Sequence, residues 1–298
     1  MLKPFLERVK QGEVLLADGA LGTMLMQRGL SSGASPDEFV LSHPEALQGI
    51  AREYLAAGAE IMVTDTFGAS PLKLASYGLA ERTGEINRRA VELACAVAGD
   101  KAYVFADIGP SGRIVKPYGD TDPSAIAASY EQQMRVLAET RVDAFCLETM
   151  IDLAEARLAV QAAKKVAPAI PVVATMTFEK RRRGFFTVMG SNIRQVAEGL
   201  AEAGADVIGA NCGSGIEQMI ETARELRAAT SLPMSIRPNA GLPQATEAGT
   251  NYPETPEFMA GKLTELLDAG VSIIGGCCGT TPAHIRAFRR VIDRRAGR

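Results

Sequence analysis

The feature that most constrains the fold of this chain is a strand-like segment that recurs eight times. Each segment is a short, mostly continuous apolar run rich in β-branched residues, as expected of strands covered on both faces. The eight runs are Val14–Ala20, Glu60–Phe67, Tyr103–Gly109, Ala144–Met150, Pro171–Phe178, Asp206–Cys212, Pro233–Pro238 and Val271–Cys277. Helical patterns separate them, so the sequence predicts an α/β fold in which strands and helices alternate.

The helical patterns and the glycines that end them complete this prediction. They cover Pro44–Gly58, Ser124–Arg141, Leu153–Ala167, Asn192–Ala203, Gly215–Ala229, Thr255–Ala269 and Pro282–Arg295. Gly58, Gly204 and Gly270 each stand just before a strand, where glycine adopts the left-handed helix cap. No linker or charge block divides the chain, so we expect residues 1–298 to form one (β/α)₈ barrel domain. A doubly wound sheet would need a G-x-G-x-x-G loop after the first strand, and Asp18–Thr23 does not match it.

Composition and charge exclude several classes of protein. The formal net charge is −3, which leaves no electrostatic footprint for nucleic acid. The five cysteines, an odd number with two adjacent, fit a reducing compartment better than a disulfide framework. Met1–Arg8 carries charges where a signal peptide needs an apolar stretch, and no apolar run approaches the ~20 residues that span a bilayer. We therefore predict a cytoplasmic protein with no membrane or nucleic-acid partner.

Polar residues stand at the carboxyl ends of these apolar runs. In a (β/α)₈ barrel the carboxyl ends of all eight strands meet at one mouth, which carries the catalytic groups. A ring of polar groups there is costly unless it binds something. The residues concerned are Asp18, Asp65, Thr66, Asp107, Glu148, Thr175, Asn211, Cys212, Arg237, Asn239, Cys277 and Cys278.

Three of these residues are cysteines, and they point to a metal. Thiolates favour zinc, and three protein ligands leave one zinc coordination position open. Cys277 and Cys278 can share one ion with Cys212 only if their strand has already ended, because adjacent strand residues face opposite sides. A phosphate cradle at Ile274–Gly276 and a purely structural zinc site are the alternatives. Cys95 is expected to be an ordinary packing residue.

Cys146 is also expected to be a core residue, although it lies near the mouth. Two carboxylates, Asp18 and Glu148, are expected to face each other there. They fit three interpretations: a structural pair, an acid/base pair as in glycosidases, or acceptors for a substrate ammonium group. We favour the ammonium interpretation, since it suits an amino-acid thiol.

The other predicted substrate contacts are weaker signals. The turn Leu21–Thr23 and the backbone after Asp18, at Gly19 and Ala20, are candidates to hold a substrate carboxylate, helped by the Thr66 hydroxyl. Asn239 is a candidate to occupy the open coordination position of the metal when no substrate is bound. His43 and His284 are not expected to be ligands. The basic cluster Lys180–Arg183 is either a solvated loop tip or a contact for an acidic partner domain.

Together these motifs resemble the homocysteine S-methyltransferase family over nearly the whole chain, most closely the homocysteine-binding barrel of its cobalamin-dependent methionine synthase branch. The matching segments are Leu16–Thr23, Thr64–Ala69, Asp107–Pro110, Glu148–Thr149, Met176–Phe178, Asn211–Cys212, Pro238–Gly241 and Gly275–Thr280. Gly275–Thr280 is the most specific of them. One departure is Asp65, where methionine synthases often have Asn.

The resemblance implies an enzyme that transfers a methyl group to the thiol of L-homocysteine (EC 2.1.1). Cys212, Cys277 and Cys278 would bind Zn²⁺, and the metal-activated substrate thiol would be the nucleophile, with no other catalytic side chain. Asp18 and Glu148 would hold the homocysteine amino group. The methyl donor is expected to be methylcobalamin or another methylcorrinoid carried on another domain or protein. S-methylmethionine and betaine are alternative donors, although S-methylmethionine-dependent members usually have Arg where Gly279 stands. A phosphate-binding barrel lyase or isomerase is the alternative outside this family.

Overall fold

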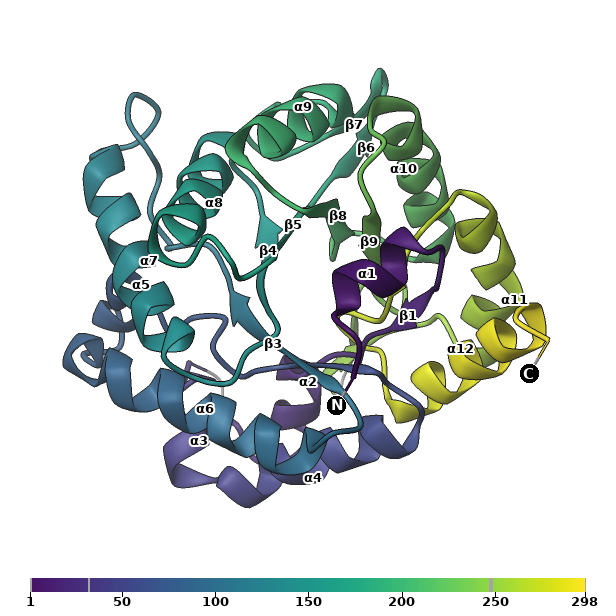
Figure 1. Cartoon of the computed structure of the whole chain (residues 1–298), viewed down its shortest axis with the longest axis horizontal. Coiled ribbons are helices and arrows are strands. Elements are labelled where there is room, and N and C mark those ends of the chain that lie inside the picture. Colours follow the sequence, from purple (N-terminus) through teal and green to yellow (C-terminus); the bar gives the residue numbers. More distant parts are fainter. Residues whose placement is uncertain (1, 32, 247–248, 298) are drawn as a thin grey trace.

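The computed structural model describes residues 2–31, 33–246 and 249–297. Eight parallel strands form one sheet in the order β1-β12-β9-β8-β5-β4-β3-β2. A parallel bridge between Ala17 and Ile61 joins β1 to β2 and closes the sheet into a barrel (Figure 1). The strands are β1 (Leu15–Leu16), β2 (Ile61–Val63), β3 (Tyr103–Ile108), β4 (Ala144–Met150), β5 (Val172–Met176), β8 (Val207–Asn211), β9 (Met234–Arg237) and β12 (Ile273–Ile274).

A ring of helices surrounds the barrel and covers the outer face of the sheet (Figure 1). The long helices are α4 (Pro44–Ala56), α6 (Thr83–Ala98), α7 (Pro123–Ala138), α8 (Leu153–Val166), α9 (Ile193–Ala203), α10 (Ile216–Ala229), α11 (Pro256–Asp268) and α12 (Pro282–Arg295). The shorter ones are α2 (Gly22–Met26), α3 (Phe39–Ser42), α5 (Pro71–Ala75) and the 3₁₀ turn η1 (Ala80–Arg82). The architecture is the predicted (β/α)₈ barrel, and the predicted left-handed caps are present at Gly58, Gly204 and Gly270.

Helix α6 contains the helical stretch expected around Cys95, for which the sequence pattern indicated no bounds. Its inward face carries Thr83 and Asn87, both buried, beside its apolar residues. The Asn87 side-chain amide donates hydrogen bonds to the carbonyl oxygens of Ala69 and Thr83, which satisfies it in the interior. Polar residues on the buried face interrupt the apolar stripe by which an amphipathic helix is identified.

The barrel interior is apolar near the amino-terminal ends of the strands. Helix α1 (Phe5–Lys10), seen in front of the barrel in Figure 1, closes this end. Phe5 and Val9 pack into one cluster with inward-facing strand residues, among them Phe105 and Cys146. The Phe5 and Phe105 rings lie 4.8 Å apart between centroids. Side chains thus fill the barrel interior at its amino-terminal end, whereas catalytic groups of such barrels lie at the opposite end.

The interior becomes polar toward the carboxyl ends of the strands. Side chains alternate across a strand, so Phe105 and Asp107 on β3 share the inward face, as do Cys146 and Glu148 on β4. The register pairs Asp107 with Cys146 and, on the far side, Asn211 with Arg237. The polar groups at the mouth therefore continue the same inward rows as the apolar groups below them.

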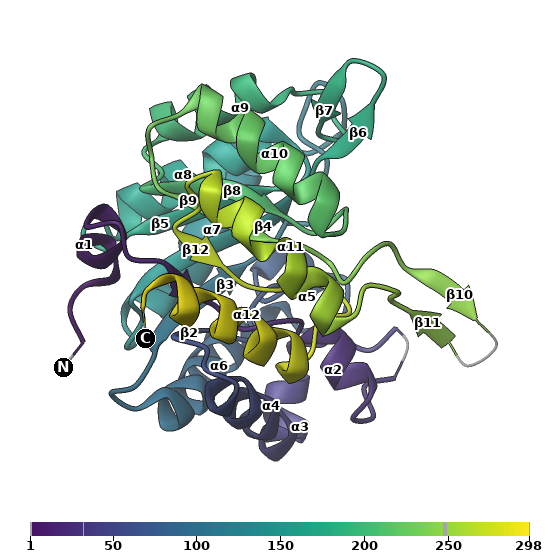
Figure 2. The same ribbon diagram turned by 90° about the vertical axis from the view of Figure 1, so that its right-hand side faces the viewer.

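The long connections after β5 and β9 form two antiparallel hairpins that the sequence pattern does not reveal. They are β6 (Glu179–Arg181) with β7 (Gly184–Phe186), and β10 (Gln244–Thr246) with β11 (Gly249–Asn251). Figure 2 shows both hairpins extending on the side of the molecule away from α1. Residues 32 and 247–248, in the connections that follow β1 and β9, lie outside the described residues. Within the described parts of the chain, no helix has the length and apolarity needed to cross a membrane.

Candidate metal and substrate site at the barrel mouth

A cavity of about 240 Å³ opens at the carboxyl ends of the strands. Its volume exceeds many times the ~30 Å³ share of one water molecule, so it has room for a small substrate. Its wall brings together groups from distant parts of the sequence. The chemically reactive groups in the wall are Asp18, Asp65, Asp107, Glu148, Arg237, Cys212, Cys277 and Cys278.

The three predicted cysteines lie together on one side of this cavity. The Sγ atoms of Cys212, Cys277 and Cys278 are all within 4.8 Å of one another, and those of Cys212 and Cys278 are 4.0 Å apart. Tetrahedral zinc with Zn–S bonds of ~2.3 Å would hold its sulfurs about 3.8 Å apart. The Cys212–Cys278 pair is thus within a few tenths of an ångström of that spacing, and no pair of the three exceeds it by more than about 1 Å.

Backbone turns beyond the strand ends place these cysteines. Strand β12 ends at Ile274, so Cys277 and Cys278 are free of the strand alternation, as predicted. The Cys277 N–H donates to the Pro238 carbonyl at 2.8 Å. Cys212 directly follows β8 with φ of +59°, a left-handed conformation that is uncommon for a residue other than glycine. Such a conformation is held by its surroundings and is often found at functional sites.

The thiols perturb one another strongly. Hydrogen bonds from Cys277 and Cys278 lower the pKa of the Cys212 thiol to about 3. The same contacts raise the pKa of Cys277 well above its ordinary value, and the pKa of Cys278 rises to about 11. These contacts favour the thiolate form at Cys212, with Cys277 and Cys278 as its hydrogen-bond donors.

Polar groups around the sulfurs orient them. The Asn211 side-chain amide donates to the Cys277 Sγ at 3.7 Å and to the Thr149 hydroxyl at 2.8 Å. Asn239 is 4% exposed, and its Oδ1 is buried without a hydrogen-bond partner. A buried, unpaired amide oxygen costs free energy, so a bound cation or water near Asn239 would relieve it.

The opposite side of the cavity is built around Arg237. This guanidinium is buried; it donates through Nη1 to Glu148 Oε2 and through Nη2 to Asp18 Oδ1 at 3.3 Å. Its Nε–H donates to the Gly276 carbonyl at 3.3 Å, which joins this side to the cysteine turn. Asp18 and Glu148 therefore meet across the mouth as predicted, and an arginine lies between them.

Burial raises the pKa of three aspartates in the wall, Asp18, Asp65 and Asp107. Desolvation raises the pKa of Asp18 to about 7, against the opposing effect of Arg237. Desolvation, followed by the charge of Glu148, raises the pKa of Asp107 well above its ordinary value. For Asp65 the causes are desolvation and then the nearby Asp37. One oxygen of each of Asp65 and Asp107 is buried without a hydrogen-bond partner.

The predicted carboxylate subsite is only partly available. Gly19 and the turn Leu21–Thr23 line the cavity. The Ala20 N–H, by contrast, already donates to the Thr280 hydroxyl at 3.1 Å. The Thr66 side chain is fully buried and donates to the Asp107 carbonyl at 2.7 Å. The expectation for Thr66 is therefore corrected: its hydroxyl fixes the backbone of β3 instead of facing the cavity, because β2 and β3 are neighbours there.

The residues expected to be structural have structural surroundings. The His284 imidazole contacts the Thr281 N–H and the Glu254 carbonyl, at 3.1 and 3.0 Å. Cys95 lies on α6, away from the cavity wall. Cys146 is buried in the barrel interior, and its Sγ lies 3.9 Å from Glu148 Oε2, directly below the mouth.

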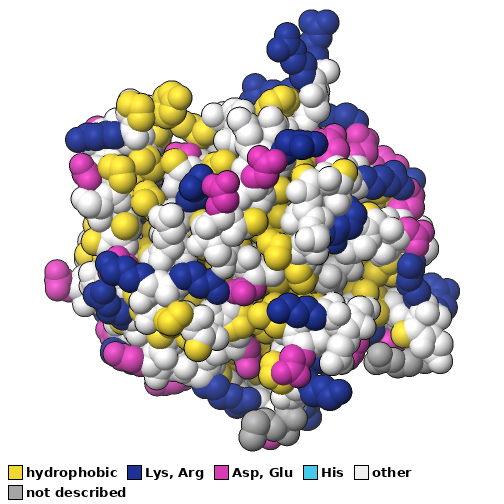
Figure 3. All heavy atoms as spheres, turned by 45° about the horizontal axis from the view of Figure 1, so that its top comes forward, with side chains coloured by type: hydrophobic (Ala, Val, Ile, Leu, Met, Phe, Trp, Pro, Cys, Tyr) yellow, Lys and Arg dark blue, Asp and Glu magenta, His cyan; other side chains and the backbone are white. Residues whose placement is uncertain are grey.

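The basic cluster Lys180–Arg183 lies at the tip of the exposed β6–β7 hairpin. Lys180 pairs with Glu221 at 2.5 Å and Arg181 with Glu179 at 2.8 Å. On the face drawn in Figure 3, Lys and Arg side chains are interspersed with Asp and Glu. This mixture does not resemble a continuous basic stripe of the kind that nucleic-acid-binding surfaces carry.

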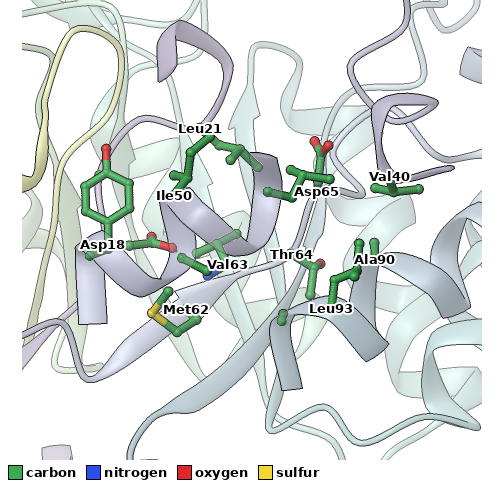
Figure 4. Close-up of a pocket in the computed structure, with 15 residues that line it drawn as sticks. Asp18, Leu21, Val40, Ile50, Met62, Val63, Thr64, Asp65, Ala90 and Leu93 are labelled. Atoms are coloured by element: carbon green, nitrogen blue, oxygen red, sulfur yellow. The ribbon is translucent and has the colours of Figure 1, made fainter. Parts of the chain in front are cut away.

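A second, much smaller cavity of about 30 Å³ lies behind the wall, between β2 and helices α4 and α6. Figure 4 shows Asp18 and Asp65 on two sides of it, with apolar side chains such as Leu21 and Ile50 near them. It has room for about one water molecule. Of these two cavities, only the one at the mouth has room for a small substrate, and it also carries the cysteines and carboxylates.

Sequence reasoning assigned no role to Arg237 or to the side chain of Asp107. The available signal was a charged residue in an otherwise apolar strand, Met234–Arg237. Arg is almost never fully buried unless it is paired, so such a position calls for partner carboxylates. The sequence alone does not say which carboxylates of the mouth these are.

Comparisons with known proteins identify the family of this chain. The family model described as homocysteine S-methyltransferase matches residues 15–292. Methionine synthase of Mycobacterium tuberculosis is 33% identical over 290 residues, which cover 92% of this chain and 24% of that protein. Methionine synthase of Mycobacterium leprae is 31% identical, covering 94% of this chain and 24% of its own length. The chain thus spans about a quarter of the length of these curated relatives.

Solved structures agree on the fold. The metallated form of the homocysteine methyltransferase MmuM from Escherichia coli superposes with a TM-score of 0.81 at 24% identity, covering 97% of this chain and 99% of that one. Its apo form gives a TM-score of 0.73 at 22% identity, covering 97% and 100%. The family model and the mycobacterial relatives, which extend over nearly all of the chain, establish that it belongs to the homocysteine S-methyltransferase family.

Proposed function

We propose that this chain is a single homocysteine-binding barrel, residues 1–298, that catalyses methyl transfer to the thiol of L-homocysteine and so forms methionine. The observation that carries this proposal is the cluster of three sulfurs within 4.8 Å of one another in the wall of a substrate-sized cavity. Family membership supports the choice of substrate.

The donor set of the sulfur cluster fits zinc. Three soft thiolates with the unpaired Asn239 Oδ1 beside them make up the composition of an open zinc site, with one position left for substrate. Zn²⁺ held by Cys212, Cys277 and Cys278 would lower the pKa of a coordinated thiol, which supplies the nucleophile. Asn211 would orient Cys277 through its side-chain amide. Zinc binding is therefore part of the proposal.

The other groups of the wall would bind the amino-acid part of the substrate. Gly19 and Leu21–Thr23 in the wall are proposed to hold the carboxylate of the substrate. The side of the cavity that carries the protein's own carboxylates is proposed to hold the substrate ammonium. The substrate thiol loses its proton, its sulfur forms a bond to the methyl carbon, and the bond from that carbon to the donor breaks. Three free thiols in contact require a reducing compartment such as the cytoplasm.

The proposed methyl donor is a methylcorrinoid on another domain or protein. A Cβ atom at Gly279 would lie 2.1 Å from the Tyr252 ring, and φ there is +80°, so this turn does not accept the Arg that S-methylmethionine-dependent members usually have. The connections after β1, β3, β5 and β9 also carry large exposed apolar side chains, which suit docking of a bulky donor. These side chains are Met26, Ile114, Tyr118, Val188 and Leu242.

A side-by-side assay tests this function. Zinc-loaded protein is supplied with L-homocysteine and with methylcobalamin, S-methylmethionine or betaine, and methionine formation is measured. We expect methionine to form with methylcobalamin as donor and not with S-methylmethionine or betaine. Methionine from one of the other two donors would replace the corrinoid in the proposal.

A binding experiment separates this function from its alternatives. Homocysteine is titrated into the zinc-loaded protein with proton release followed in two buffers, and release of about one proton per thiol is expected for an open metal site. Purely structural zinc predicts no such release. A phosphate-binding lyase or isomerase predicts that inorganic phosphate, and not homocysteine, raises the melting temperature.

A further inference from the structure

Strand β4 carries an extra residue where it reaches the mouth. Between two pairs that are in register with β5, strand β4 has two residues, Glu148 and Thr149, where β5 has only Thr175. Two residues opposite one make a β-bulge, which bends the strand and re-aims a side chain. Thr149 has φ of +58°, a conformation that a β-branched residue rarely adopts. The direction of the Glu148 side chain therefore depends on the contacts that hold this bulge.

The side-chain amide of Asn211, at the end of β8, holds the bulge. Its Oδ1 accepts from the Thr149 N–H and from the Thr175 hydroxyl, both at 2.7 Å. Its Nδ2 donates to the Thr149 hydroxyl at 2.8 Å and to the Cys277 Sγ at 3.7 Å. An asparagine side chain offers two N–H donors and a carbonyl oxygen with two lone pairs, so this fully buried amide uses all of them. A rotated amide would point its NH₂ group at the Thr149 N–H, so only one orientation fits.

The same amide therefore joins the two sides of the cavity. It fixes the bulge that carries Glu148, and it contacts the sulfur of Cys277. Among the described residues, Thr149 and Cys212 are the two non-glycine residues with a positive φ. Asn211 bonds to the first and directly precedes the second, and strained backbone persists only where its surroundings hold it. Asn211 itself lies outside the cavity wall, so it would act without touching the substrate.

A fixed span between the two sides would limit the length of the substrate. In the proposed function the ammonium lies beside the carboxylates, and the substrate sulfur lies at the ion that the cysteines hold. Homocysteine has one methylene more than cysteine between its sulfur and the carbon that carries the ammonium. One methylene changes binding ~10–200-fold, and a misplacement of ~1 Å can cost about a hundredfold. Discrimination of this kind requires that both sides keep their relative positions.

We propose that Asn211 is a positioning residue that fixes Glu148 relative to the sulfur cluster, and that it thereby selects amino-acid thiols of the length of homocysteine over shorter ones. Thr149 and Thr175 hold the Asn211 amide in the required orientation. The inference rests on the proposed function, because it names the residue that sets the length of substrate which that site accepts.

The preference for homocysteine over cysteine tests this role. L-Homocysteine and L-cysteine are titrated into zinc-loaded wild type, Asn211→Leu, Thr175→Val and Thr177→Val, and the ratio of the two calorimetric Kd values is the readout. We expect wild type to prefer homocysteine at least about tenfold, and Asn211→Leu to lose about tenfold of this preference. Thr175→Val removes one of the four hydrogen bonds of the amide and should lose about threefold.

Thr177→Val is the matched control. The Thr177 hydroxyl donates at 3.0 Å to the backbone carbonyl of Asn211 and not to its side chain, so we expect the preference to change by less than about twofold. The preference is a ratio within one variant, so it does not depend on the folded fraction of the preparation. Zinc per chain is measured after each titration, because both free thiols can also bind zinc.

A purely structural role would weaken the binding of both thiols equally. The assignment is therefore overturned if Asn211→Leu and Thr175→Val keep the wild-type ratio, if Thr177→Val loses as much preference as Thr175→Val, or if wild type has no preference. If Asn211→Leu does not fold or loses zinc, Thr175→Val decides, because it leaves the contact to Cys277 in place. Wild type that binds neither thiol would instead refute the proposed function itself.

Discussion

The two sides of the mouth cavity are built in different ways. The sulfur side, made of Cys212, Cys277, Cys278 and Asn239, lies on turns beyond the ends of β8, β9 and β12. The carboxylate side, made of Asp18, Asp107, Glu148 and Arg237, takes three of its four residues from within the strands β3, β4 and β9. Turns can change without disturbing the packed interior, whereas inward-facing strand residues are part of it. Substitutions on the sulfur side are therefore expected to reduce zinc binding and activity. Substitutions on the carboxylate side are expected to lower stability as well.

The largest expected effect is on the sulfur side. Cys277→Ser removes one of three soft ligands, so we expect zinc to fall from about one per chain to near zero and methyl transfer to fall at least about a thousandfold. Metal analysis and the methylation assay measure both. Cys95→Ser on α6 is the matched control and keeps zinc and activity. A metal-free Cys277→Ser protein with full activity would rule out the proposed zinc chemistry.

The next effect is on the carboxylate side. Arg237→Met leaves Asp18 and Glu148 buried without their counter-charge, which costs about 3–5 kcal/mol of unfolding free energy. Urea unfolding of the metal-free proteins measures it. Adding Asp18→Asn and Glu148→Gln should recover much of the loss, since no unpaired buried charge remains. Arg135→Met, which breaks an exposed pair with Glu131, is the control and should cost less than about 1 kcal/mol.

A smaller effect with a defined pH dependence is expected at Asp65. Burial and Asp37 raise its folded-state pKa, so the folded protein retains a proton that the unfolded chain releases above ~pH 4. The contribution of Asp65 to the unfolding free energy is fully present below that pH. It is lost as the pH rises through the folded-state pKa.

Asp65→Asn removes this loss. The variant should match wild type near pH 4 and exceed its unfolding free energy by about 1–3 kcal/mol at pH 8. Urea unfolding from pH 4 to 8 measures the difference. Asp120→Asn in an exposed loop should show none. A gain for Asp65→Asn that is equal at both ends of this range would contradict the titration account.

The smallest effect returns to the sulfur side. Asn239→Ala removes the unpaired oxygen beside the thiols, and loss of such a neighbouring group typically weakens metal binding about tenfold. Competition with a chromogenic zinc chelator measures the affinity. Unfolding of the metal-free protein should be unchanged, in contrast with Arg237→Met. If Asn239→Ala destabilised the metal-free barrel as much as Arg237→Met does, the distinction between the two sides would fail.

Much of this molecule is readable from local sequence pattern. The eight apolar runs predict the barrel because strands covered on both faces need continuous apolar residues, and glycine caps mark where helices end. The cysteines were found because a thiol at the end of a strand is rare and chemically specific. The bounds of helix α6, around Cys95, could not be predicted because buried Thr83 and Asn87 interrupt its apolar face. The strands are shorter than the apolar runs, because the chain leaves the sheet where polar groups begin.

The sequence by itself determined the barrel, the mouth as the expected site of chemistry and the three sulfurs that meet there. Only the tertiary structure decided how the polar groups pair. Arg237 lies between Asp18 and Glu148 and leaves Asp107 unpaired, and these residues come from strands one, three, four and seven of the barrel. Local pattern reports which face of a strand is buried. Pairing depends on the closure and register of the whole sheet, which no single segment contains.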